Sequence, residues 1–112
     1  MQISHDSGLC TVIVTVDGAP EHLAEAAEHA SQGLRRFAGF PGFVAGATHR
    51  SADGARLVQY LQWRSEADHQ ACMADPSWAA DPSSQRFMAQ MQAGEIAVDV
   101  RVYTVAAQAE GE

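Results

Sequence analysis

The 112-residue chain contains no lysine and no asparagine, and each absence excludes a class of chemistry. Without lysine there is no Schiff-base catalysis, no pyridoxal anchor and no P-loop lysine. Without asparagine there is no N-glycosylation site. The only two cysteines, Cys10 and Cys72, are too few for a disulfide framework. They are therefore expected to be reduced thiols of a cytoplasmic protein.

Basic charge and long apolar runs are also scarce. Seven arginines against fourteen acidic residues give a formal net charge of −7, which argues against a nucleic-acid partner. No apolar run approaches the roughly 20 residues of a membrane span, and the polar segment 1–8 does not resemble a signal peptide. We therefore expect no membrane partner, and one domain over residues 1–112 with its core in 9–105 and a loose C-terminal tail.

Hydrophobic periodicity predicts four strands and three helices. Alternating or β-branched apolar residues indicate strands at 9–16, 43–50, 56–63 and 96–105. Helical spacing after Pro20, and a capping box that opens at Ser65, predict helices at 20–37 and 65–74. A further helix is expected at 83–93, and the Asp53-Gly54 loop should join the two middle strands as a hairpin.

This order of elements is typical of the α+β class. It predicts a ferredoxin-like split βαβ sandwich, in which one antiparallel sheet carries its helices on one face. The opposite face should be bare, which is a liability in a monomer. The sequence therefore predicts a homodimer through the sheet faces. The side chains expected on the bare face include Val12, Val14, Val16, Val58 and Tyr60.

The strand at 56–63 carries the most informative side chains. Its alternation places Gln59 and Trp63 on one face, together with Leu57 and Leu61. If that face meets the helices, the Gln59 amide and the Trp63 indole could donate hydrogen bonds to a flat ligand between apolar walls. The alternative is that Trp63 belongs to the core and that Gln59 bonds a neighbouring backbone group.

Other side chains could complete such a site, each with a structural alternative. His49 could lie at the pocket mouth and act as a base, or remain a surface residue at a strand end. Arg86 could stabilise a phenolate or lie in solvent. His69 is a candidate pocket residue. Met73 and Met91 would suit either a pliable wall around an aromatic ligand or the core.

Metal and cofactor signals are weak. His22, Glu25 and His29 could mimic a metal-binding face, but this alternation is more often a solvated helix face. Cys72 follows His69 by three residues without an orienting third group, so it is expected to pack. The glycines of 39–46 lack the strand-turn-helix context of a dinucleotide loop. We therefore expect no metal site and no tightly bound cofactor.

Several short motifs spread over the chain occur together. They are Pro41-Gly42-Phe43, His49-Arg50-Ser51 with Asp53-Gly54, Tyr60-x-Gln62-Trp63, the Ser65 helix cap, Asp75-Pro76 and Val102-Tyr103. With this set, the chain resembles the antibiotic biosynthesis monooxygenase family. The resemblance implies the dimeric ferredoxin-like α+β barrel of that family.

The resemblance also implies a reaction. The protein would be an oxidoreductase that oxygenates a polycyclic aromatic polyketide intermediate of anthrone or angucycline type. O₂ would be the co-substrate, reduced by a substrate-derived carbanion or phenolate, and the product would be a quinone or a hydroxylated ring. One alternative is ring opening by C–C cleavage, with reduced flavin supplied by a partner reductase. Two others are haem binding or degradation, and a non-enzymatic binding dimer.

Site residues follow from the same resemblance. Trp63 matches a family tryptophan, Gln59 replaces a family asparagine, and Arg86 falls near a family arginine. With His49, these are the predicted catalytic residues. His69 falls near a family tyrosine. The predicted substrate-binding residues are His69, Leu61, Met73, Phe87, Met91 and Phe43.

Overall fold

The computed structural model describes residues 9–111 of the chain. The polar segment 1–8, for which no signal peptide is expected, lies outside the described residues. In the described part, four strands and four helices follow one another, and residues 104–111 form neither helix nor strand. The elements are β1 (Cys10–Gly18), α1 (Pro20–Phe37), β2 (Phe43–Arg50), β3 (Arg56–Trp63), α2 (Glu66–Met73), α3 (Ser77–Ala80), α4 (Pro82–Gln92) and β4 (Ile96–Tyr103).

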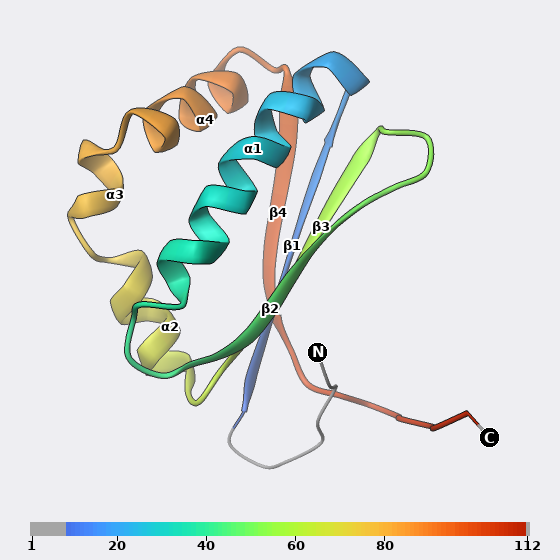
Figure 1. Cartoon of the computed structure of the whole chain (residues 1–112), viewed down its shortest axis with the longest axis vertical. Coiled ribbons are helices and arrows are strands. Elements are labelled where there is room, and N and C mark those ends of the chain that lie inside the picture. Colours follow the sequence, from blue (N-terminus) through green and yellow to red (C-terminus); the bar gives the residue numbers. More distant parts are fainter. Residues whose placement is uncertain (1–8, 112) are drawn as a thin grey trace.

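The strands form one antiparallel sheet in the order β2-β3-β1-β4. Helix α1 carries the chain from β1 to β2, and β3 then folds back between them, which is the split βαβ arrangement. All four helices lie on one side of the sheet (Figure 1). The predicted fold class is therefore confirmed.

The strand register decides which side chains meet the helices. Val14 lies opposite Gln59 and Val16 opposite Leu57, and directly opposed residues share a face. The prediction that Val12, Val14 and Val16 occupy the bare face is therefore wrong, because these valines pack under the helices. The open face instead carries the residues between them and their neighbours, including Ile13, Thr15, Val58, Tyr60, Asp99 and Arg101.

Local signals place the helix ends. Pro20 begins α1, where its missing N–H costs no hydrogen bond. Ser65 caps α2 as predicted, because its hydroxyl accepts a 3.1 Å hydrogen bond from the Asp68 backbone N–H. Asp81 caps α4 in the same way through Ser84 N–H at 2.8 Å. The short helix α3, between α2 and α4, was not predicted.

The core between sheet and helices consists of two clusters. The first joins Trp63, Val12 and Leu61 to Phe37 of α1 and Cys72 of α2. The second joins β1, β3 and β4 to the first half of α1. Its buried members are Val16, Leu23, Ala26, Leu57 and Ile96. None of the helices in residues 9–111 is long and apolar enough to cross a bilayer.

Candidate active site

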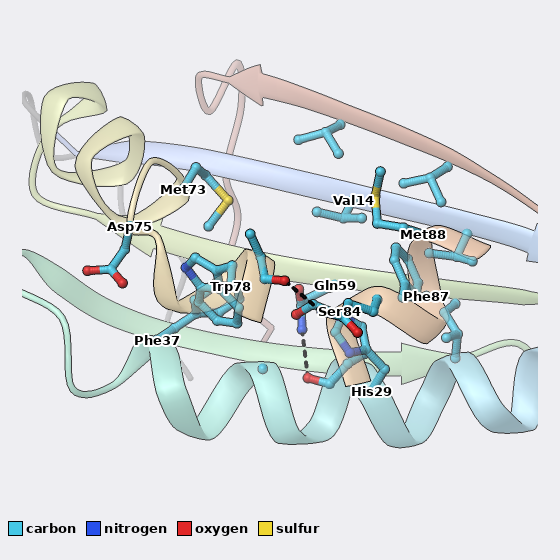
Figure 2. A pocket seen from close by; sticks show the side chains of 18 of the residues that line it. Val14, His29, Phe37, Gln59, Met73, Asp75, Trp78, Ser84, Phe87 and Met88 are labelled. Carbon is cyan, nitrogen blue, oxygen red and sulfur yellow. Dashed lines mark hydrogen bonds between the residues drawn. The ribbon is translucent and has the colours of Figure 1, made fainter. Parts of the chain in front are cut away.

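A cavity of about 810 Å³ lies between the helix face of the sheet and helices α1, α3 and α4. This volume is within the range of small-molecule sites. Its walls are mostly apolar, with aromatic rings on two sides (Figure 2). The main wall residues are Val14, Val98, Val100, Phe37, Trp78, Phe87, Met73 and Met88. The large exposed fractions of Met73, Met88 and Val100, 45%, 50% and 54%, place the mouth beside them.

Gln59 places a polar group in the cavity floor. Its Nε2 donates to the carbonyl oxygen of Ala30 at 3.2 Å and to Thr48 Oγ1 at 3.1 Å. Because the Ala30 carbonyl can only accept, these contacts fix which end of the amide is nitrogen. Both amide hydrogens are used, so Gln59 offers a ligand only its Oε1 acceptor. The prediction that the Gln59 amide donates a hydrogen bond to a ligand is therefore wrong, because the amide can only accept one there.

His29 is the second polar group that faces the cavity (Figure 2). Its Nδ1 lies 2.7 Å from Ser83 Oγ, and its ring stacks on Phe87 with centroids 4.6 Å apart. The adjacent residue, Ala30, is the one that Gln59 contacts, so the two polar groups are neighbours. Burial lowers the pKa of His29 below its ordinary value, with the Asp81 carboxylate opposing and the Arg36 guanidinium reinforcing that shift.

Several other polar side chains of the wall already have hydrogen-bond partners, including Asp75, whose Oδ1 accepts from the Ser77 backbone N–H at 2.9 Å. Thr48 accepts from Gln59, and Ser84 Oγ donates to Asp81 at 3.1 Å. Gln85 donates to the Ala79 carbonyl at 3.0 Å. Among the described residues of the cavity wall, the polar atoms left free to bind a ligand are therefore Gln59 Oε1 and His29 Nε2, together with Asp75 Oδ2 and the amide of the exposed Gln92.

Three of the predicted site residues line the cavity, and five lie outside it in the core or against it. Gln59, Met73 and Phe87 are wall residues. Trp63 and Leu61 are buried in the first core cluster and do not line the cavity, whereas Phe37 of the same cluster does. The other three are Phe43, packed against that cluster; His69, whose ring centroid is 5.7 Å from that of Trp63; and Met91, packed against the second cluster.

The prediction that His49 lies at the pocket mouth is wrong. His49 pairs with Val58 rather than with Gln59, so its side chain belongs to the open face of the sheet. It is exposed there, on the side away from the helices. Hairpin register decides this, because alternate residues of one strand point to opposite faces.

The prediction that Arg86 stabilises a bound anion is also not supported by its position. Its Nε donates to Glu25 Oε1 at 2.7 Å and its Nη2 to Glu25 Oε2 at 3.0 Å. Glu95 lies 3.5 Å from the same guanidinium. Arg86 does not line the cavity, since these two carboxylates hold it on the outer surface of α1 and α4.

The residues that sequence reasoning missed come mainly from α1 and the segment after α2. His29 follows the buried Ala26 by three positions and precedes the buried Gly33 by four. A helical wheel therefore places it at the edge of the apolar stripe, which is a signal that could have identified it. Trp78 belongs to the unpredicted α3, and no pattern in the sequence indicates that it would line a cavity.

Neither a thiol nor a metal cluster supplies chemistry in the described part of the chain. Cys72 is buried as expected, and burial raises the pKa of its thiol to about 11, so it stays protonated. Within residues 9–111, no three His, Cys, Asp or Glu side chains are grouped to hold a metal ion.

Both a protein-family model and a curated protein are similar in sequence to this chain. The antibiotic biosynthesis monooxygenase model matches residues 10–80, from β1 to α3. Tetracenomycin-F1 monooxygenase from Streptomyces glaucescens is 42% identical over 77 residues, which are 66% of this chain and 67% of that protein. The family model's match ends at residue 80 and leaves out α4 and β4, so it does not cover the Ser83 and Phe87 side of the cavity.

Solved structures share the fold at low sequence identity. A variant of SnoaB, a cofactor-independent oxygenase from Streptomyces nogalater, superposes with a TM-score of 0.68 at 18% identity, covering 91% of this chain and 97% of that one. PA3566 from Pseudomonas aeruginosa gives 0.67 at 18% identity, covering 93% and 100%. With the family model matching well over half of its length, the chain belongs to the antibiotic biosynthesis monooxygenase family and is an oxygenase.

Proposed function

We propose that this oxygenase acts on a polycyclic aromatic polyketide intermediate of anthrone type, with O₂ as co-substrate and no tightly bound cofactor. The observation that carries the proposal is the cavity of about 810 Å³ with aromatic walls and few free polar groups. Fused aromatic rings bury much apolar area in such a space and stack on its rings. Tetracenomycin-F1 monooxygenase, 42% identical over the matched residues, supports this substrate class.

The reaction needs only the substrate as reductant. Loss of a proton from the central ring of an anthrone gives an electron-rich carbanion or phenolate. This anion reduces O₂, and the resulting radical pair combines to a hydroperoxide that loses water to leave a quinone carbonyl. The protein must hold the rings, exclude bulk water and support the charge that develops. The apolar walls around Phe37, Trp78 and Phe87 support the first two requirements.

The test is whether product formation depends on O₂ alone. Purified protein would be mixed anaerobically with 1,8-dihydroxyanthrone or a linear tetracyclic hydroxyanthrone, and O₂ would then be admitted. We expect the quinone to form faster than in a protein-free control, with one O₂ consumed per quinone. Equal rates with and without protein would refute the proposal. A requirement for added reduced flavin would favour the ring-opening alternative.

Haem binding is less consistent with the walls of the cavity. Haem propionates normally need cationic partners, and among the described wall residues only His29 can become cationic. His69, the ligand candidate from the sequence, lies against Trp63 rather than in the cavity. The oxygenase proposal has no such conflict.

We propose in addition that two copies associate through the open face of the sheet. No helix of the described residues covers this face (Figure 1), and it carries Ile13, Val58 and Tyr60. Burial of such a face between two copies would remove apolar surface from water. Each copy would retain its own cavity, because the cavity lies on the opposite side of the sheet.

Replacement of Gln59 by methionine should lower kcat/KM by about fivefold or more. The change keeps the length of the side chain but removes the acceptor that would meet a substrate hydroxyl, together with the donor contacts to Ala30 and Thr48, and one hydrogen bond contributes about 1 kcal/mol or more. Steady-state kinetics with the anthrone probes would measure the effect. Gln32→Met, the same change at an exposed position of α1, is the matched control. Equal losses in both variants would contradict a role for Oε1.

A further inference from the structure

We propose that His29 is the general base of the reaction and that Ser83 holds it in the form that can accept a proton. The inference rests on the proposed function and deepens it, because it names the group that removes the substrate proton. It is carried by the position of one imidazole ring between α1 and α4. Of the histidines in the described part of the chain, only His29 lines the cavity.

Two contacts fix the orientation of the ring. Nδ1 lies 2.7 Å from Ser83 Oγ, and the ring lies nearly parallel to Phe87, at 24° with centroids 4.6 Å apart. A ring held at one edge and on one face cannot turn freely. None of the residues in 9–111 is hydrogen bonded to Nε2, which is therefore the atom left for a ligand in the cavity.

The Ser83 hydroxyl decides what Nε2 can do. A neutral imidazole carries its hydrogen on one nitrogen and a lone pair on the other. If Nδ1–H donates to Ser83 Oγ, the lone pair is on Nε2, the ring nitrogen that none of the residues in 9–111 engages. This form is a base, whereas the opposite tautomer would present a hydrogen to the substrate. Ser83 is thus a positioning residue, and His29 is the catalytic one.

The charges around His29 leave it neutral near pH 7. Burial lowers its pKa, and Arg36 on the same helix lowers it further. Asp81, the cap of α4, acts in the opposite direction but pairs with Arg36 at 3.6 Å. Gln59 and Thr48, the polar side chains that the sheet places in the cavity wall, carry no charge. A neutral imidazole at physiological pH is what proton abstraction requires.

The proton balance is complete with O₂ as the oxidant. His29 Nε2 takes one proton from the ring CH₂ or hydroxyl of the anthrone, which leaves an imidazolium and the substrate anion. The anion gives one electron to O₂, and the radical pair forms a C–O bond as a peroxide anion. The imidazolium returns its proton to that peroxide. Loss of the second C–H proton with cleavage of the O–O bond releases water and leaves the carbonyl, and His29 ends neutral.

The main test is the substitution His29→Asn. The asparagine nitrogen can still donate to Ser83, but the side chain cannot accept a proton at neutral pH. We expect kcat with 1,8-dihydroxyanthrone and the tetracyclic hydroxyanthrone to fall about 100-fold, within the range of a lost general base. His22→Asn is the matched control, because His22 lies on the same helix outside the cavity. Thermal melts of both variants show whether either has lost its fold.

The pH profile of the wild type is a second measurement that needs no variant. The base form of His29 increases as pH rises through its pKa, so kcat/KM should be flat at neutral pH and fall on the acid side. The midpoint should lie below 6.5, the ordinary value, because burial lowers the pKa. This acid limb should be absent from the residual activity of His29→Asn. An acid limb unchanged in that variant would overturn the assignment.

The role of Ser83 has its own signature in ¹⁵N NMR of histidine-labelled protein. We expect the wild type to show His29 protonated on Nδ1, and Ser83→Ala to shift the population toward Nε2–H. Turnover of Ser83→Ala should fall three- to tenfold, which corresponds to the loss of one hydrogen bond. Ser83→Thr keeps the hydroxyl and should restore both the turnover and the Nδ1–H population. Wild-type His29 protonated on Nε2 would overturn the proposal.

The outcomes separate this inference from the function on which it rests. O₂-dependent turnover by the wild type, together with turnover by His29→Asn within threefold of it, overturns the base assignment alone. Absence of O₂-dependent turnover in the wild type overturns both. Loss of turnover in a folded His29→Asn, with His22→Asn unaffected, supports both.

Discussion

Replacement of Trp63 by alanine is expected to lower the free energy of unfolding by about 3–5 kcal/mol, the usual cost of truncating a buried aromatic side chain. Trp63 has an exposed fraction of 0% and lies at the centre of the first core cluster. Its ring centroid is 5.2 Å from that of Phe43 and 6.0 Å from that of Phe37. Urea unfolding followed by circular dichroism would measure the loss. A change below about 1 kcal/mol would contradict the central place of Trp63 in the core.

The control is Trp63→Phe, which keeps an aromatic ring. It removes the Trp63 Nε1–H, a buried donor without a partner among residues 9–111. Relief of that unpaired group offsets the lost ring area, so we expect stability to change by about 1 kcal/mol or less. We also expect turnover to survive, because Trp63 does not line the cavity. Loss of turnover at unchanged stability would show that the indole N–H contacts the ligand.

Tyr60→Asp is expected to convert the proposed dimer to monomers. Tyr60 lies between Ile13 and Ala47 on the open face, where the dimer would bury it. A carboxylate there loses its hydration without gaining a partner, which costs several kcal/mol. A cost of about 4 kcal/mol corresponds to a roughly 1,000-fold weaker dimer. Size-exclusion chromatography with light scattering would measure the masses.

Two further variants make the dimer test specific. Ala24→Asp adds the same charge at an exposed position of α1, on the helical side of the molecule, and should remain dimeric. Tyr60→Phe removes only the hydroxyl and should also remain dimeric. A Tyr60→Asp protein that is still dimeric would place the interface elsewhere, and the open face would then need another explanation.

The elements of the fold were predictable because each has a local cause. The alternation in 56–63 and the boundary residues Pro20 and Ser65 act within a few positions of the chain, so β3, α1 and the start of α2 were located correctly. Alternation also showed which residues of β1 share a face. It could not show that Val14 pairs with Gln59 rather than with a neighbour, since a shift by one residue reverses the face.

The site was less predictable because it depends on contacts distant in sequence. Arg86 was the only charge of its predicted helix, but the chain has twice as many acidic as basic residues, and Glu25 from α1 binds it. His29 and Ser83 are 54 positions apart, and only the packing of α4 against α1 brings them together. Gln59 was located correctly, but which end of its amide is free depends on Ala30 and Thr48.

The fixed orientation of the Gln59 amide bears on which ring substituent the cavity can hold. Because both of its hydrogens are bound to Ala30 and Thr48, the side chain cannot rotate to present them elsewhere. A ring hydroxyl against Oε1 is held by a hydrogen bond, whereas a ketone in the same place sets one lone pair against another. Gln59 therefore selects for a ring that presents a hydroxyl at this point of the cavity and against one that presents a ketone there.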